Sequence, residues 1–273
     1  MKLKSLCATF VSAPLAFVSG VAFADTAPAP TPDLTVTGSA AIVSQYRFRG
    51  LAQSDNKPVA QASITISHKS GFYLSTWGSS ASAGCSTGVC TAPINIGGTE
   101  IDVYGGWTHG LGKSGLTVDM GVYGYLYPGA TNGNYYEIYG SLAKTFGPAT
   151  AKIGVNVAPS QNVFNFNFTN LAAHHNTYVY GELGGGIPKT PLSVHTHLGY
   201  TSGGFEWGKK YLDYNAGVSY KWKALTFDIS VVGTDVSKSN IDKGFGCLGS
   251  VACINSFNRM SKTVAVGSIT ASF

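Results

Sequence analysis

From Thr35 to the end of the chain, polarity alternates residue by residue in segments of about ten residues, which turn residues separate. In residues 224–234 the alternating residues are Leu225, Thr226, Phe227, Asp228, Ile229, Ser230 and Val231. Successive side chains of a strand point to opposite faces, so such a segment would have one apolar and one polar face. We find no helical period in this part of the chain, and the pattern therefore predicts an all-β fold.

Twelve such segments can be counted. They are 35–48, 59–68, 71–79, 99–108, 115–126, 135–145, 149–158, 176–186, 191–200, 211–222, 224–234 and 262–273. An even number of strands allows an antiparallel sheet to close with both ends of the chain on one side.

The N-terminal residues have the three parts of a secretory signal peptide. Lys2 and Lys4 precede an apolar run that ends in the small-x-small site Ala22-Phe23-Ala24. An uncleaved membrane anchor is the alternative, but Pro14 interrupts the run. We expect a signal peptide over 1–24, a Pro/Ala-rich periplasmic lead-in over 25–34 and one large domain over 35–273.

The composition is unusual for a soluble domain. Charged residues make up 11% of the chain, against roughly 25% in soluble proteins. After the signal, no apolar stretch approaches the ~20 residues that a membrane helix needs. The other structure that can cross a bilayer is a closed barrel. Together with the alternation, this predicts a transmembrane antiparallel up-and-down β-barrel of about twelve strands in the outer membrane of a Gram-negative bacterium.

The lengths of the connections support this prediction independently. Every second connection is short, near Lys69, His109–Ser114, Gly147–Pro148, Pro188–Pro191 and Lys223. The connections between them are mostly longer, around 49–58, 80–98, 127–134, 159–175, 201–210 and 235–261. Tight periplasmic turns and longer external loops are typical of outer-membrane barrels.

Four cysteines follow the signal, in two local pairs. Cys85 lies close to Cys90, and Cys247 lies close to Cys253. An even count in an exported chain favours one disulfide within each external loop. A four-cysteine metal site is the alternative, but neither pair has the C-x₂-C spacing of common structural zinc sites.

Several segments resemble porins of the TorF family. They are SQYRFRG (Ser44–Gly50), QSDNKP (Gln53–Pro58), SGFYLSTWGSS (Ser70–Ser80), EIDVYGGW (Glu100–Trp107), LDYNAGVSY (Leu212–Tyr220) and LTFDISVVGTD (Leu225–Asp235). The resemblance covers most of the chain after the signal and implies a small outer-membrane barrel with a role in solute transport. It supplies no catalytic or ligand-binding residues.

Alternation also predicts which charged side chains face the inside of such a barrel. The candidate pore-lining residues are Arg47, Glu100, Asp102, Asp119, Glu137, Lys152, Glu182, His195, His197, Asp213 and Asp228. With Arg49 at the rim and Lys221, the inward tally is seven carboxylates against four basic side chains.

This acidic excess favours a porin-like channel that passes small hydrophilic solutes and prefers cations, because carboxylates lining a pore attract cations. In one alternative the charges pair and plug a narrow lumen, for example through Arg47 and Lys152. A second alternative is a non-conducting structural or surface-binding barrel with disulfide-pinned loops.

Enzymatic activity has little support in the sequence. His195 and His197 share one face of a strand, but two ligands do not make a metal site. Ser193 shares that face with His195, yet two residues along a strand is too far for a hydrogen bond, and we expect no other serine nearby. We therefore expect no enzyme, no cofactor and no metal.

The expected partners follow from the predicted location. They are outer-membrane lipid, small hydrophilic solutes or ions, and the barrel-assembly machinery, which would bind the C-terminal strand ending in Phe273. The net charge of +5 is scattered along the chain, so no nucleic-acid partner is expected.

Overall fold

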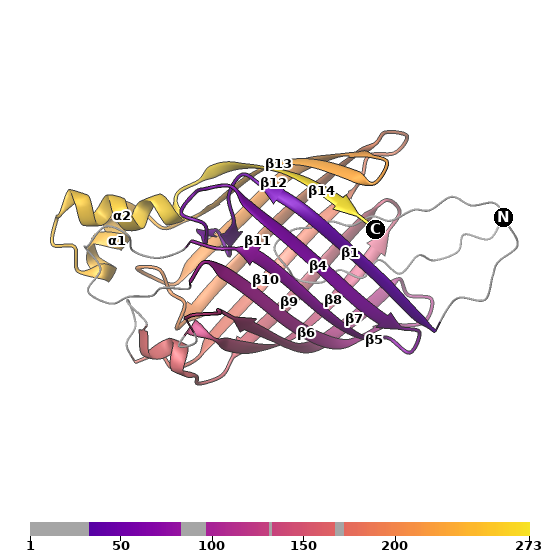
Figure 1. The fold of residues 1–273 in the computed structure, drawn as a ribbon, viewed down its shortest axis with the longest axis horizontal. Coiled ribbons are helices and arrows are strands. Elements are labelled where there is room, and N and C mark those ends of the chain that lie inside the picture. Colours follow the sequence, from indigo (N-terminus) through magenta and orange to yellow (C-terminus); the bar gives the residue numbers. More distant parts are fainter. Residues whose placement is uncertain (1–32, 83–96, 131–132, 167–171) are drawn as a thin grey trace, which may run out of the picture.

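In the computed structural model, residues 33–82, 97–130, 133–166 and 172–273 are described. Twelve of its strands form a closed antiparallel barrel (Figure 1). They are β1 (Leu34–Val43), β4 (Val59–His68), β5 (Phe72–Ser80), β6 (Thr99–Gly110), β7 (Leu116–Leu126), β8 (Tyr135–Phe146), β9 (Ala149–Ala158), β10 (Asn176–Gly186), β11 (Leu192–Gly203), β12 (Tyr211–Trp222), β13 (Leu225–Thr234) and β14 (Val264–Ser272). The predicted fold class is thus confirmed.

The barrel closes where the first strand meets the last. β1 pairs with β4 along its whole length and with β14 over residues 39–43. At this seam the amide of Gly38 donates to the carbonyl of Phe273 at 2.8 Å, and the amide of Phe273 donates back to Gly38. The remaining strands pair with their neighbours in sequence, so each connection joins two adjacent strands.

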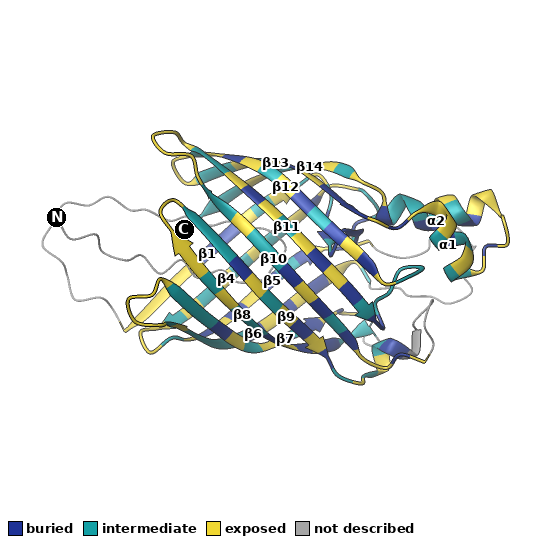
Figure 2. Ribbon diagram, turned by 180° about the vertical axis from the view of Figure 1, so that it is seen from behind, coloured by how far each residue is buried: buried dark blue, intermediate teal, exposed yellow. Residues whose placement is uncertain are grey.

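Buried and exposed residues alternate along the strands (Figure 2), with apolar side chains exposed on the outside and polar ones covered on the inside. Ile229 on β13 is 65% exposed, whereas the next residue, Ser230, is 5% exposed. On β9, Ile153 is likewise 65% exposed, whereas the preceding Lys152 is 5% exposed. The charge of Lys152 is thereby kept away from the apolar outer face of the barrel.

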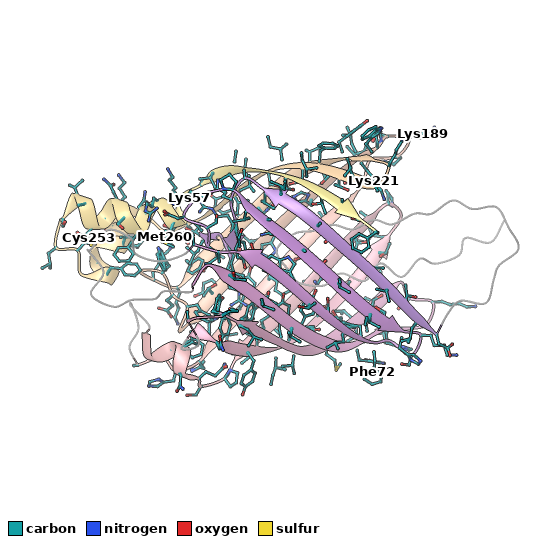
Figure 3. All side chains as sticks on the ribbon, in the orientation of Figure 1. Lys57, Phe72, Lys189, Lys221, Cys253 and Met260 are labelled. Carbon is teal, nitrogen blue, oxygen red and sulfur yellow. A yellow bond between two sulfur atoms is a disulfide. The ribbon has the colours of Figure 1, made fainter. Side chains whose placement is uncertain are left out.

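The two ends of the barrel differ. β1 begins and β14 ends at the end that carries the short turns, while the longer connections gather at the opposite end (Figure 1). Lys189 lies in one of the short turns, and Lys57 and Met260 lie at the other end (Figure 3). Residues 1–24 and most of 25–34 lie outside the described residues, as do Cys85 and Cys90.

The first predicted strand, 35–48, was too long. β1 ends at Val43, and a separate hairpin follows, made of β2 (Arg47–Phe48) and β3 (Leu51–Ala52). Its two-residue turn has positive φ at both Arg49 (47°) and Gly50 (76°). Two positive φ angles are typical of the tight turns whose twist matches paired strands. We call residues 44–58 the inner hairpin segment.

The prediction that no helix follows Thr35 was wrong. Two helices, α1 (Lys238–Phe245) and α2 (Val251–Ser261), lie in the connection between β13 and β14, and a 3₁₀ helix covers Asn162–Phe166. Ser237 caps α1 by accepting from the amide of Asn240, which stabilises a short helix. None of the helices in the described residues is long and apolar enough to cross a membrane.

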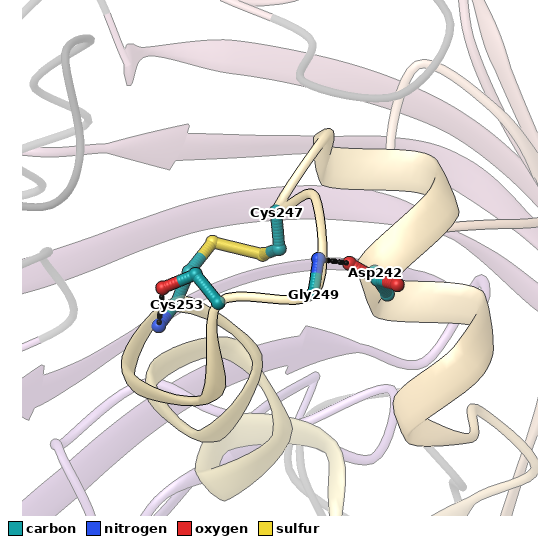
Figure 4. The surroundings of a disulfide bond; sticks show 5 residues. Asp242, Cys247, Gly249 and Cys253 are labelled. Atoms are coloured by element: carbon teal, nitrogen blue, oxygen red, sulfur yellow. Dashed lines mark hydrogen bonds between the residues drawn. A yellow bond between two sulfur atoms is a disulfide. The ribbon is translucent and has the colours of Figure 1, made fainter.

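The two helices form a small cap with a core of its own. Phe245 stacks on Phe257 with ring centroids 4.0 Å apart, and Trp207 meets both rings edge-on. A disulfide joins Cys247 to Cys253 between the helices (Figure 4). The cap therefore packs mainly through aromatic contacts above the barrel, while its disulfide closes only a short loop.

Candidate functional site

All eleven candidate pore-lining residues lie on the inner side of the barrel. Those less than 9% exposed are Arg47, Glu100, Asp102, Asp119, Glu137, Lys152, His195 and Asp213. Glu182, His197 and Asp228 are only partly covered, with side chains 23%, 13% and 20% exposed. Ten of these positions agree with the parity of the barrel strands, whereas Arg47 lies on the inner hairpin segment. The positions do not by themselves make a pore.

Tyrosines fill the lumen along β5 to β8. The buried cluster consists of Tyr46, Val59, Tyr73, Trp77, Ala81, Tyr104, Tyr123, Tyr125, Tyr127, Tyr135 and Tyr139. Tyr104 stacks on Tyr123 with centroids 4.4 Å apart, and Tyr125 stacks on Tyr135 at 4.2 Å. We call this part of the lumen the filled half.

The carboxylates of the filled half are held by tyrosine hydroxyls. Tyr73 donates to Asp119 at 2.9 Å. Tyr123 donates to Asp102, also at 2.9 Å. In the same way Tyr46 donates to Glu100 at 3.1 Å. Because a buried carboxylate is costly without such donors, these tyrosines make the acids compatible with a packed interior.

Arg49 fastens the inner hairpin segment to the barrel wall. The sequence places Arg49 at the rim, but the structure places it inside, where its Nη2 lies 2.6 Å from Oε2 of Glu137 on β8. Its guanidinium also lies 4.1 Å from the ring centre of Tyr178 on β10. Asn156 and Tyr125 donate to the same Glu137 oxygen. The hairpin is therefore held across the lumen by a buried ion pair.

Arg47, which could have plugged the lumen by pairing with a carboxylate, does not bind one among the described residues. Its Nη1 donates to the carbonyl of Met260 at 2.6 Å and to that of Gly50 at 3.2 Å. Its Nη2 donates to Gln45 at 2.7 Å. Arg47 thus connects the hairpin to the end of α2. The basic residue that pairs with a carboxylate across the lumen is Arg49.

A cavity of about 160 Å³ remains beside the hairpin, and Tyr46, Trp77 and Tyr125 of the aromatic cluster form part of its lining. Small or uncharged side chains from β1, β4 and β14 form one wall, namely Ser39, Ala41, Gln61, Ser268 and Thr270. Of the candidate residues, those that line the cavity are Arg47, Glu182, His197, Asp213 and Asp228. We call this part of the lumen, bounded by β1, β4 and β9–β14, the open half.

Charged groups form a chain along the open half. Lys152 Nζ lies 3.6 Å from Glu182, and His197 lies 3.4 Å from Glu182 through Nδ1. The other imidazole nitrogen of His197 lies 3.2 Å from Asp213. The charges that line the cavity are therefore held in place by neighbouring strands, which gives the site a fixed pattern of donors and acceptors.

Residues 27–272 match the family described as "Bacterial protein of unknown function (Gcw_chp)". The chain belongs to the Gcw_chp family. This match does not test the resemblance to TorF-family porins, which stays a prediction. No curated protein matches the sequence.

Solved structures similar to this Gcw_chp barrel include Salmonella typhi OmpF in complex with daunomycin and a porin refined at 1.8 Å resolution. The OmpF match has 9% identity and a TM-score of 0.42, covering 88% of this chain and 97% of OmpF. The porin match has 10% identity and a TM-score of 0.40, covering 88% of this chain and 100% of the porin. At these scores the likeness assigns no function.

The structure corrects the expectation that no serine approaches the histidines. In this Gcw_chp barrel, Oγ of Ser230 lies 3.1 Å from Nε2 of His195. The two residues sit on β11 and β13, directly across Gly217 of β12, which has no side chain to separate them. The Ser230 hydroxyl also donates to Asp228, at 2.5 Å.

This arrangement falls short of an enzyme site. A nucleophile would have its hydroxyl directed at the histidine, whereas that of Ser230 is bound to a carboxylate. Nor do the described residues contain a group of three or more His, Cys, Asp or Glu side chains placed to hold a metal ion. Strand parity predicts which side chains point inward, but only the register between strands shows that Ser230 lies next to His195.

Proposed function

We propose that this protein is an outer-membrane channel for the passive diffusion of small hydrophilic solutes, with a preference for cations. The observation that carries the proposal is the cavity of the open half, which lies beside the inner hairpin segment and has Glu182, Asp213 and Asp228 among its lining residues. Solutes would pass between the hairpin and the wall of small side chains.

The outer surface of the barrel supports a place in a membrane. Large apolar side chains project outward from many strands, including Ile42 (68% exposed) and Phe72 (64%). Each residue of this kind would be costly to leave in water, whereas a bilayer covers all of them. The proposed location is the outer membrane, as the predicted signal peptide and the closed antiparallel barrel favour.

The charges of the lumen support a preference for cations. Arg49 pairs with Glu137, and Lys152 pairs with Glu182. The inner carboxylates that have no Arg or Lys within ion-pair distance among the described residues are Glu100, Asp102, Asp119, Asp213 and Asp228. Asp213 and Asp228 line the cavity, where a low-dielectric wall concentrates their field.

The test is the reversal potential of the purified protein in a planar bilayer under a salt gradient. We expect cation preference in the wild type and a weaker preference in Asp228→Asn, because this substitution removes a charge that lines the cavity. Asp119→Asn is the matched control, since Asp119 lies in the filled half, where it is bound by Tyr73.

Salt provides a second check. The preference should fade between 0.1 M and 1 M salt, where the screening length falls from ~10 Å to ~3 Å. A reversal potential that favours anions would refute the charge argument.

The alternative is a non-conducting barrel that binds a partner at its capped end. The buried Arg49–Glu137 ion pair, which holds the hairpin across the lumen, favours it. The absence of current steps from protein that is folded and inserted would support this alternative and reject the channel.

A further inference from the structure

We infer that the open half contains a binding site for a small zwitterion, a molecule with one carboxylate and one ammonium group, such as a free α-amino acid. This inference names the solute class of the proposed channel and rests on that function. It comes from three nearly buried residues, Arg49, Asn156 and Asp213, that line the same cavity and each keep one polar atom without a hydrogen-bond partner among the described residues.

Arg49 provides the cationic part of the site. One of its terminal nitrogens, Nη2, is used by Glu137. The other, Nη1, has no partner in the described part of the chain, although the side chain is only 5% exposed. A guanidinium binds carboxylates through parallel N–H groups, so the remaining nitrogen can take a second carboxylate. A buried donor of this kind is costly unless a ligand or water satisfies it.

Asp213 and Asn156 provide the acceptors. Oδ1 of Asp213 accepts from Tyr178 at 3.1 Å and lies 3.2 Å from His197, whereas Oδ2 has no partner in the described ranges. Asn156 donates its Nδ2 to Glu137 at 3.0 Å, which fixes the orientation of the amide. Its carbonyl oxygen is thereby left as a free acceptor. An ammonium group carries three donors and can serve both oxygens.

Tyr178 holds the cationic and anionic parts next to each other. Its ring lies under the guanidinium of Arg49, at 4.1 Å, while its hydroxyl donates to Asp213. The tip of the hairpin also lies close to Asp213. A Cβ atom added to Gly50 would lie 3.0 Å from the Cβ atom of Asp213. Each charge is already committed to another partner on one side, so a fixed positive residue and a fixed negative residue lie beside one cavity.

The charge pattern selects among small solutes. Asp213 would repel a simple carboxylate, Arg49 would repel a simple amine, and a zwitterion matches both. A polyol could form hydrogen bonds with the same atoms. Its hydroxyl groups are uncharged, so only the protein group in each bond would carry a charge, and the bonds would be weaker than those of a zwitterion. The cavity has room, since about 160 Å³ is on the order of ten times the ~15 Å³ that holds one water.

The experiment measures binding to the full chain in detergent by calorimetry, using L-alanine, propionate, ethylamine and glycerol. We expect saturable binding of L-alanine, and binding of the other three weaker by about tenfold or more, since each lacks at least one of the two charges. Equal binding of glycerol would assign a polyol site and overturn the inference. Preferential binding of propionate or ethylamine would overturn it as well.

Two variants test the residues. Asp213→Asn keeps the shape of the side chain and should weaken L-alanine binding by about tenfold or more, while Asp119→Asn, in the filled half, should leave binding unchanged. If Asp213→Asn does not fold, Arg49→Lys serves instead, because a lysine can pair with Glu137 but lacks the second nitrogen of the fork. Binding that is unchanged in whichever of these two variants folds would overturn the site.

Current recordings separate this inference from the proposed function. In a conducting wild type, L-alanine should reduce the ion current in a saturable way. L-alanine binding without conductance would refute the channel and leave the site, whereas conductance without L-alanine binding would refute the site and leave the channel.

Discussion

The two halves of the lumen are built on the same alternation of strands and differ in what the inward side chains fill. In the filled half, the rings of Tyr104, Tyr123 and their neighbours lie with centroids 4.2–4.6 Å apart, and the acids are bound to hydroxyls. In the open half, Ser39 and Ser268 stand at comparable positions and a cavity remains. Parity therefore separates inside from outside, and side-chain volume decides whether a cavity remains in the lumen.

The inner hairpin segment contacts both halves. Tyr46 packs against Trp77 on the filled side, with ring centroids 5.3 Å apart. Arg47, Phe48, Arg49 and Gly50 border the cavity. The hairpin therefore completes the packing of one half and sets the width of the other.

The largest expected effect comes from breaking the ion pair that holds the hairpin. Arg49→Met leaves Glu137 buried without its cation, a change that costs about 3–5 kcal/mol. We expect the hairpin to leave the wall and the single-channel conductance to rise severalfold. The matched control is the double variant Arg49→Met with Glu137→Met, because apolar replacement of a whole buried pair is often nearly neutral. A wild-type conductance in the single variant would show that the hairpin does not limit the pore.

Filling the open half should have the next largest effect. Ser268 on β14 lines the cavity, so Ser268→Phe should occupy much of it and lower the conductance severalfold. Ala265 lies on the same strand but faces outward, so Ala265→Phe should leave the current unchanged. Equal currents in the two variants would mean that ions do not pass through the open half.

Much of the fold could be predicted from the sequence, because strand parity is a local property. Twelve segments with alternating polarity became twelve barrel strands. Four strands have the predicted bounds, and seven others differ by at most three residues at either end. The first strand was the exception. Residues 44–48 continue the alternating pattern of the first strand, but they turn into the lumen. There Arg49 binds Glu137, which lies 88 positions further along the chain.

Other features were missed because their signals are short or depend on register. α1 and α2 have eight and eleven residues, and the α1 cap uses Asn240 where a capping box usually has Glu or Gln. The contact of Ser230 with His195 needs the register β11–β12–β13 across Gly217. Parity placed the acids inside, but it could not divide them between the filled half and the open half.

A smaller effect is expected when a hydroxyl is removed from the filled half. Tyr73 donates to Asp119 at 2.9 Å and also hydrogen-bonds to Tyr139. Tyr73→Phe should lower the free energy of unfolding by about 1–3 kcal/mol, because a buried carboxylate loses a donor. The current should stay as in the wild type. Urea unfolding in detergent checks this, with the outward-facing Tyr220→Phe as control. A changed conductance with unchanged stability would mean that ions pass through the filled half and that its hydrogen bonds do not stabilise the barrel.

The smallest effect on either half should come from the cap disulfide. Cys247 and Cys253 are six positions apart, so the bond closes a short loop and should contribute about 2 kcal/mol at most to local order. In Cys247→Ser with Cys253→Ser, faster hydrogen exchange should be confined to α1, α2 and the turn between them, where Gly249 donates to Asp242. Thermal unfolding of the barrel and the single-channel current should match the wild type, because the aromatic contacts of Trp207, Phe245 and Phe257 remain. A change in current would mean that the cap controls the hairpin through the bond between Arg47 and the Met260 carbonyl, and the two halves would then not be independent of it.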